Sequence, residues 1–244
     1  MTRHRRSALI FVCGILVAAA ACIRTGEMRE RTESVLLGGI TAGDIRLKMG
    51  AGRINVSGGA ADDDLVTGRF RTNVARWEAR VEHRPAGNGE RVTIEQRRST
   101  GISVGSARNE WDVKLTGKIP LELDLAFGAG QADVDLRGVQ ARRLTVHMGA
   151  GEVRLDLSGE RTLGLEGRLN GGVGSGTIVL PTQIGVRVRV DGGIGSVRAP
   201  GFAKNGHEYT NDAYGKTAAA IELTVHAGIG SIDLRQSGPK TGAF

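Results

Sequence analysis

The sequence predicts an all-β chain whose strands stack as the rungs of a β-solenoid, in the manner of a β-roll. Three observations lead to this prediction. A Gly-x-Gly segment recurs six times, each copy continues with alternating apolar and polar residues, and the chain beyond the N-terminal segment contains no convincing amphipathic helix. Alternation with a period of two is typical of strands that have one buried and one solvated face. Glycine is the compositional outlier, with 38 residues in 244, and a glycine-based repeat explains that excess.

The spacing of the Gly-x-Gly copies indicates one structural unit for each copy. Their first glycines fall at positions 50, 128, 149, 174, 193 and 228, so the intervals are 78, 21, 25, 19 and 35 residues. Three consecutive intervals near twenty residues are typical of stacked repeats. We therefore expect twelve glycines to turn the corners of the rungs: Gly50, Gly52, Gly128, Gly130, Gly149, Gly151, Gly174, Gly176, Gly193, Gly195, Gly228 and Gly230.

Aligning the copies on these first glycines produces columns of apolar residues. The column four positions later contains Ile54, Ala132, Val153, Ile178, Val197 and Ile232. A packed interior explains such a column, and a chain that turns tightly at every rung needs glycine where φ is positive or backbones approach closely. A phosphate-binding loop would instead need a helix directly after the glycines. None of the six copies has one, so we interpret the glycines as structural.

Further strands are expected between the repeats. Residues 76–96 alternate on both sides of a Pro85–Gly89 turn and predict a β-hairpin. Residues 110–127 predict two strands that break near Gly117 and Pro120, and residues 201–216 predict a longer loop or a short hairpin. We divide the chain into residues 1–21, 22–34, 35–126 (an N-terminal part with a hairpin insertion) and 127–244 (the C-terminal repeats).

The first 21 residues have the plan of an export signal. A basic start, MTRHRR, is followed by the apolar run Ser7–Ala21, which is short for a membrane span. The sequence AAAC that ends at Cys22 resembles the lipobox of bacterial lipoproteins, which implies that Cys22 carries a lipid. Residues 22–34 would then form the lipidated cysteine and a polar tether. Cleavage after an Ala-x-Ala site, which would yield a soluble secreted protein, remains the alternative.

Composition excludes several classes of function. The only cysteines are Cys13 and Cys22, both at the N-terminal segment, so no disulfide framework, cysteine metal site or thiol enzyme is expected in the body of the protein. The net charge of +7 includes three signal arginines, which leaves about +4 after their removal. A surplus that small, with only 4% aromatic residues, argues against nucleic-acid binding.

The order of the segments is similar to that of a known family. Residues 110–157, EWDVKLTGKIPLELDLAFGAGQADVDLRGVQARRLTVHMGAGEVRLDL, resemble the bacterial toast-rack domain proteins. The later segments LPTQIGVRVRVDGGIGSVRAPGF and IELTVHAGIGSID resemble the related C-terminal domain of cell-wall-active antibiotic response proteins. The resemblance implies an envelope-associated, adhesin-like β-solenoid without established catalytic residues. Such response proteins usually carry several membrane helices before this domain, and this chain has only a signal and Cys22.

Several polar residues are candidates for chemistry, each with a simpler structural interpretation. Asp191 and His226 are expected to be surface neighbours, with His147 at the same position of another rung, but two ligands make a poor metal site. Outward-facing Asp135 and Asp156 could form an acid–base pair of a polysaccharide lyase or hydrolase. Their neighbours Arg137 and Arg154 favour surface charge pairing instead.

An acidic run and two tryptophans also have structural interpretations. The run ADDD at residues 61–64 lacks the spacing of a calcium loop and predicts a solvated turn. Trp77 and Trp111 could mark a binding surface, but packing in the core is the preferred interpretation.

The sequence therefore predicts a non-enzymatic, lipid-anchored envelope protein that presents an interaction surface, with no metal or cofactor. Its partners would be the membrane and an envelope protein or glycan. Ile23 after Cys22 is compatible with the outer membrane in an organism that has two membranes. An envelope-stress regulator acting through a membrane partner is the alternative, and the lyase or hydrolase is a lesser one.

Overall fold

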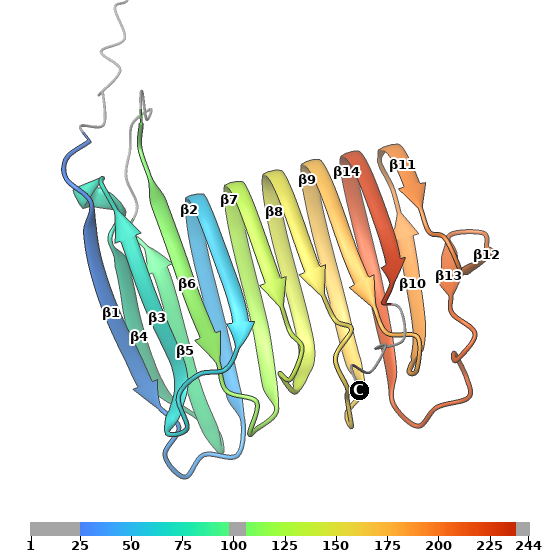
Figure 1. Ribbon diagram of the computed structural model, residues 1–244, viewed down its shortest axis with the longest axis horizontal. Helices are drawn as coiled ribbons and strands as arrows, with labels where there is room; N and C mark the ends of the chain where they lie inside the picture. Colours follow the sequence, from blue (N-terminus) through green and yellow to red (C-terminus); the bar gives the residue numbers. More distant parts are fainter. Residues whose placement is uncertain (1–24, 98–105, 238–244) are drawn as a thin grey trace, which may run out of the picture.

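The computed structural model describes residues 25–97 and 106–237, and these form an all-β structure (Figure 1). The predicted signal peptide and Cys22 lie outside the described residues. A 3₁₀ turn, η1 (Ala75–Trp77), is the only helical element in the described part. No helix there is long and apolar enough to cross a membrane. The strands are β1 (Arg29–Leu36), β2 (Gly43–Gly58), β3 (Asp64–Thr72), β4 (Ala79–Ala86), β5 (Gly89–Gln96), β6 (Asn109–Leu115), β7 (Leu121–Asp135), β8 (Ala141–Asp156), β9 (Leu165–Leu180), β10 (Gly185–Asp191), β11 (Ile194–Arg198), β12 (Ala203–Asn205), β13 (Glu208–Thr210) and β14 (Ala220–Gln236).

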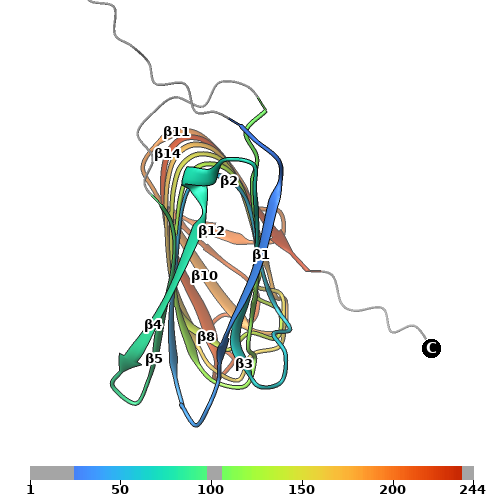
Figure 2. The ribbon, with the colours of Figure 1, turned by 90° about the vertical axis from the view of Figure 1, so that its left-hand side faces the viewer.

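Five long strands, β2, β7, β8, β9 and β14, form the body of the molecule. Each has 15 to 17 residues and pairs in parallel with the next in that order. Each strand bends near its middle and so contributes one half to each of two facing layers (Figure 2). We call one such bent strand a rung. The first halves of the rungs form one layer and the second halves form the other, with the apolar side chains between them.

The glycines lie at the bends. Gly52, Gly130, Gly151, Gly174 and Gly230 occupy equivalent places on adjacent rungs, each with φ between 129° and 151°. A Cβ on Gly151 would lie 1.9 Å from the carbonyl oxygen of Gly130. Both the positive φ and this close approach of backbones exclude a side chain at the bend.

The register of β9 differs from the predicted one by two residues. Gly174 pairs with Gly151 and is therefore the second glycine of its bend, while Gly172 takes the first place. Gly176, expected at the corner, pairs with Val153 and Ile232 in the apolar column, where Ile178 was expected. The segment Gly172-Val173-Gly174-Ser175-Gly176 contains two overlapping Gly-x-Gly patterns, and stacking on Gly151 selects the earlier one. The intervals become 21, 23 and 21 residues, closer to a constant repeat.

The last long strand is not at the end of the stack. β14 pairs with β9 on one side and with both β10 and β11 on the other, all in parallel. The strands β10 and β11 together make the final rung, interrupted at its bend. The β12–β13 hairpin within the predicted loop 201–216 covers β10, because β13 pairs antiparallel with it.

Extra strands cover the other end of the stack. β6 pairs with the second half of β2, followed outward by β3 and β1, and the predicted hairpin forms as β4 and β5, with β5 beside the first half of β2. The two predicted strands of residues 110–127 are β6 and the first half of β7.

The polar tether expected over residues 22–34 is wrong for its second half. Residues 29–34 belong to β1, which pairs antiparallel with β3, and Gly26 already donates a backbone hydrogen bond of 2.8 Å to the carbonyl of Asn73. The charged residues of this segment lie on an edge strand, where charged side chains disfavour β-sheet pairing with other chains.

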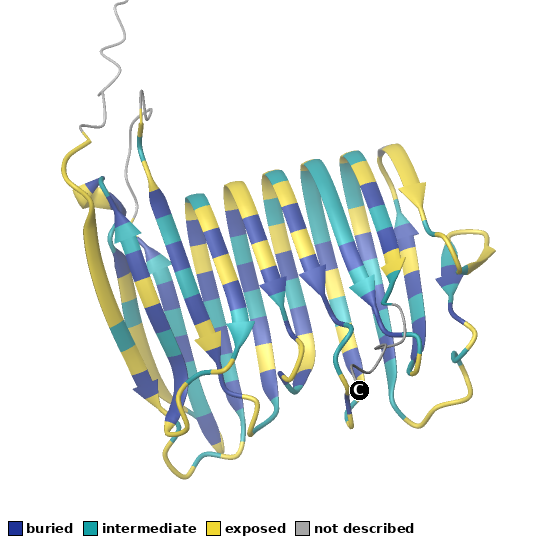
Figure 3. Cartoon of the chain, viewed as in Figure 1, coloured by how far each residue is buried: buried dark blue, intermediate teal, exposed yellow. Residues whose placement is uncertain are grey.

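One hydrophobic cluster fills the space between the two layers from β1 to the final rung. Buried and exposed residues alternate along the rungs, as Figure 3 shows. Residues 126 and 127, where the sequence analysis divides the chain, both lie inside β7.

Candidate interaction surface

The outer faces of the rungs carry rows of charged residues of both signs. On the first-half layer, ion pairs join adjacent strands: Arg91 to Asp44 at 2.6 Å, Arg143 to Glu122 at 3.4 Å, and Arg187 to Glu222 at 2.5 Å. The first and third pairs are partly buried, whereas the Arg143–Glu122 pair is exposed and contributes little to stability. Because positive and negative side chains are paired, this surface has no extended region of one charge. Such a surface is better suited to contact with a protein partner than to binding a polyanion.

The predicted neighbours Asp191 and His226 do lie side by side, on β10 and β14. His147 is two rungs away from His226, because Asn170 of β9 lies between them and contacts His147 Nδ1 at 3.3 Å. Arg189 donates to the Asp191 carboxylate at 2.8 Å and thereby lowers the Asp191 pKa. No group of three or more His, Cys, Asp or Glu residues in the described chain has the geometry of a metal site.

Asp135 and Asp156 also pair across adjacent rungs, as predicted, but their surroundings oppose acid–base catalysis. Arg137 donates to both oxygens of Asp135 at 2.5 to 3.0 Å, and these bonds lower the Asp135 pKa. A general acid needs the opposite shift. The expectation that Asp156 faces solvent is wrong: it is buried at the end of β8 and accepts hydrogen bonds from the Ser158 amide (3.0 Å) and hydroxyl (2.6 Å). Both carboxylates therefore have structural partners.

The other two candidates are structural as well. Residues 61–64 form a turn closed by the Asp64 amide and the Ala61 carbonyl at 2.9 Å, and Lys118 contacts the Asp62 carboxylate at 3.1 Å. Asp64 itself is buried and accepts a hydrogen bond from Thr67, so this part of the turn is less solvated than expected. Trp111 is only 1% exposed and packs edge-on against Phe70 at 5.4 Å, and Trp77 is buried too.

A network of buried polar side chains, here called the polar bracket, lies at the bend of β2 and consists of Gln96, Asn109 and the Trp111 indole. The sequence pattern does not predict it. The side-chain oxygen of Gln96 accepts hydrogen bonds from the amides of Gly50 (2.8 Å) and Ala51 (3.3 Å) and from the side chain of Asn109. Asn109 in turn accepts a bond from the Trp111 indole at 3.0 Å. These bonds satisfy backbone donors that face no further rung at this end. No local sequence pattern predicts that these side chains cap the bend, because Gln96 and Asn109 are brought together only by the fold.

The residue between the two bend glycines defines a ridge along the top of the stack. Its members on the five rungs are Ala51, Ala129, Ala150, Val173 and Ile229. Val173 and Ile229 are 54% and 56% exposed, so the ridge changes from small to bulky apolar residues toward β14. Exposed apolar groups that lie together are typical of interaction sites. Val173 and Ile229 are paired neighbours on β9 and β14 and are two of the five exposed large hydrophobic residues in the described chain.

Comparison with known proteins yields both a family and a structural relative. The model for the N-terminal domain of toast_rack, DUF2154, matches residues 24–179. A solved structure described as a "putative cell adhesion protein" from Clostridium sporogenes shares 31% sequence identity, with a TM-score of 0.81, and the match covers 86% of this chain and all of the other. No curated protein matches the sequence.

A more distant similarity adds little. A solved "putative adhesin" from Bacteroides fragilis shares 10% identity over 87% of this chain and 99% of its own, with a TM-score of 0.25. That score is too low to carry an argument about fold or function. The family match spans more than half of the chain, and the Clostridium relative agrees with it over nearly the whole length. The protein belongs to the toast-rack family.

Proposed function

We propose that this protein is a non-enzymatic, lipid-anchored component of the cell envelope, and that its stack of rungs is a β-solenoid used as an adhesin-like interaction surface. The observation that carries the proposal is the similarity, at 31% identity and over the full length of the relative, to a protein described as a putative cell adhesion protein. The same relative and the signal-like N-terminal sequence support the proposed envelope location.

The geometry of the candidate sites supports a role in binding. The carboxylates that could serve as acid and base, Asp135 and Asp156, are held by Arg137 and Ser158. The outer faces present ion-paired residues, and the ridge presents Val173 and Ile229. A rigid sheet with a mixed-charge face and an exposed apolar end can hold a partner without chemistry on it.

The lipid anchor rests on the AAAC sequence that ends at Cys22. Metabolic labelling with an alkyne analogue of palmitate tests it, and the chain offers a matched control. Label should disappear in Cys22→Ala and persist in Cys13→Ala, since Cys13 lies inside the apolar run of the predicted signal. Label that persists in Cys22→Ala would remove the anchor from the proposal.

The interaction role needs an experiment of its own. We would crosslink the full-length protein in intact cells and identify the attached molecules by mass spectrometry. The proposal expects crosslinks from the rung faces or the ridge to envelope proteins or glycans. Cells without such adducts, at protein levels that give efficient self-crosslinks within the stack, would contradict it.

A further inference from the structure

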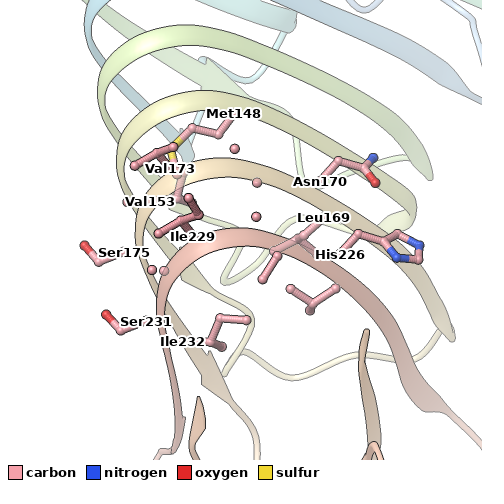
Figure 4. Close-up of a pocket in the computed structure, with 18 of the residues that line it drawn as sticks. Met148, Val153, Leu169, Asn170, Val173, Ser175, His226, Ile229, Ser231 and Ile232 are labelled. Carbon is pink, nitrogen blue, oxygen red and sulfur yellow. The ribbon is translucent and has the colours of Figure 1, made fainter. Parts of the chain in front are cut away.

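A cavity of about 70 Å³ lies inside the bends of β8, β9 and β14 (Figure 4). Its lining comes from both layers and includes the apolar side chains of Met148, Val153, Leu169, Ile178, Val225 and Ile232. The described lining residues include no Asp, Glu, Lys or Arg. The polar side chains of the lining, such as those of Asn170 and Ser175, belong to outward-facing positions of the strands. The interior surface is therefore apolar.

The cavity exists because β9 lacks two inward side chains. Just before the bend, Met49, Phe127 and Met148 stack on successive rungs, but the next two rungs have Gly171 and Ala227. Just after the bend, Val153 and Ile232 flank Gly176. A Cβ built on Gly176 would meet no atom within 4 Å, whereas one on Gly167, another inward glycine of β9, would meet Leu223 at 2.3 Å. Leu223 thus fills the space at Gly167, and no neighbour fills the space at Gly176.

Water is a poor occupant for this space. About 10 to 15 Å³ holds one water, so the volume is sufficient for several, but each needs two to four polar partners. The apolar side chains offer none, and the backbone groups of β9 are already engaged in the parallel pairing on both sides. Apolar cavities of this kind remain dry and take up apolar molecules.

The shape of the cavity and its surroundings indicate the class of ligand. The cavity crosses three adjacent rungs, and strands about 4.8 Å apart make it roughly 10 Å long. Val173 and Ile229 also contribute atoms to the lining, and their side chains are about half exposed on the ridge. We propose that this site binds the end of a saturated aliphatic chain.

Methyl NMR of the purified protein can test this proposal, because Met148 lines the cavity and Met49 occupies the corresponding position of a filled rung. The protein would be labelled at methionine methyl groups and titrated with monomeric dodecanoate. In a parallel sample, phosphatidylcholine vesicles would replace dodecanoate. The expected result is a saturable shift of the Met148 methyl resonance with the Met49 resonance unchanged. A shift with dodecanoate identifies free lipid as the source of the chain, and a shift only with vesicles identifies the bilayer.

Two variants locate the binding. Gly176→Val places in the cavity the side chain that Val153 has on the next rung, and the exclusion of about two methylene groups should weaken binding about tenfold. Thr177→Val changes the outward-facing neighbour on β9 and should leave binding unchanged. Absence of any Met148 shift in both samples would overturn the proposal, and so would equal binding by Gly176→Val and the unaltered protein.

Discussion

At the bend of β2 the interior is filled by Met49 and Phe127, and the Gln96 side chain binds the two amides at the bend. At the bends of β9 and β14 the same interior position is occupied by Gly171 and Ala227, and a cavity remains. Both regions are built from the same repeat, so the repeat alone does not determine how a bend is filled.

The two ends of the stack also differ in how many strands cover them. Beyond β2, strands β1, β3 and β6 continue the second-half layer and the β4–β5 hairpin continues the first-half layer. Beyond β14, the β12–β13 hairpin covers β10, whereas β11 pairs only with β14 among the described strands. Stacked-repeat proteins need caps to protect the apolar interior at their ends. One end of this stack is therefore closed by several strands, whereas the other leaves apolar side chains such as Val197 and Ile229 exposed.

The largest expected difference between the ends concerns their buried side chains. Trp111→Ala removes a ring that is 1% exposed and packs on Phe70, so it should lower the free energy of unfolding by about 3–5 kcal/mol. Val197→Ala, at the far end and 37% exposed, should cost about 1 kcal/mol or less. Urea denaturation of both variants measures this, and equal losses would contradict the proposed asymmetry.

The polar bracket should contribute the next largest effect. Gln96→Leu keeps the approximate size of the side chain but leaves the amides of Gly50 and Ala51 without an acceptor, at a cost of about 1–3 kcal/mol. Gln236→Leu serves as the control, because Gln236 makes its bond to Gly201 in an exposed position. Chemical denaturation should show a loss for the first variant that is clearly larger than the loss for the second.

A valine introduced after the bend should change the stability in opposite directions on β9 and on β7. Gly176→Val fills empty space and should raise the free energy of unfolding by about 1 kcal/mol. Ala132→Val, in the same column but 4% exposed in a packed region, should lower it by about 1–3 kcal/mol. A destabilised Gly176→Val would show that the cavity collapses in solution.

The smallest effect concerns pH. Burial alone would raise the Asp112 pKa, but hydrogen bonds from Asn55 (2.8 Å) and Arg69 (3.0 Å) outweigh it and hold that pKa below its ordinary value. Asp112 therefore stabilises the fold above the unfolded pKa of about 4, and this contribution disappears as the pH falls through the folded pKa. Asp112→Asn should cost at most about 1 kcal/mol at pH 7, with the difference vanishing at low pH.

The control for this experiment is at the opposite end. Arg189 lowers the pKa of half-buried Asp191, and Asp191→Asn should cost less than Asp112→Asn because Asp191 accepts hydrogen bonds from one side chain, Arg189, instead of two. Denaturation curves collected from pH 2 to 7 would measure both variants. If the difference in unfolding free energy between Asp112→Asn and the unaltered protein increased as the pH fell, the stabilising role of the Asp112 carboxylate would be contradicted.

Much of the fold could be predicted from the sequence, because alternation and bend glycines are local signals. The β4–β5 hairpin and the strands around Pro120 were predicted for that reason. The register of β9 was not, since two overlapping glycine pairs fit the pattern and only contact with Gly151 distinguishes them. The cavity depends on this register, because a pattern that places Ile178 in the column puts Gly176 at a corner instead of inside the stack. The polar bracket and the burial of Asp156 depend on contacts far apart in sequence, which periodicity does not encode.

The hydrogen bond from Gly26 to Asn73 limits how far the body can move from an anchor at Cys22. Four Cα steps separate these residues, and a fully extended chain spans at most about 14 Å over that length. A lipid on Cys22 would therefore keep the β1 edge within the headgroup neighbourhood of the bilayer. β10 lies eight strand steps from β1 in the sheet order, on the order of 40 Å at normal strand spacing. If Cys22 carries the proposed lipid, the distance that the protein reaches from the membrane is set by the length of the sheet, and each added rung would extend it by one strand spacing.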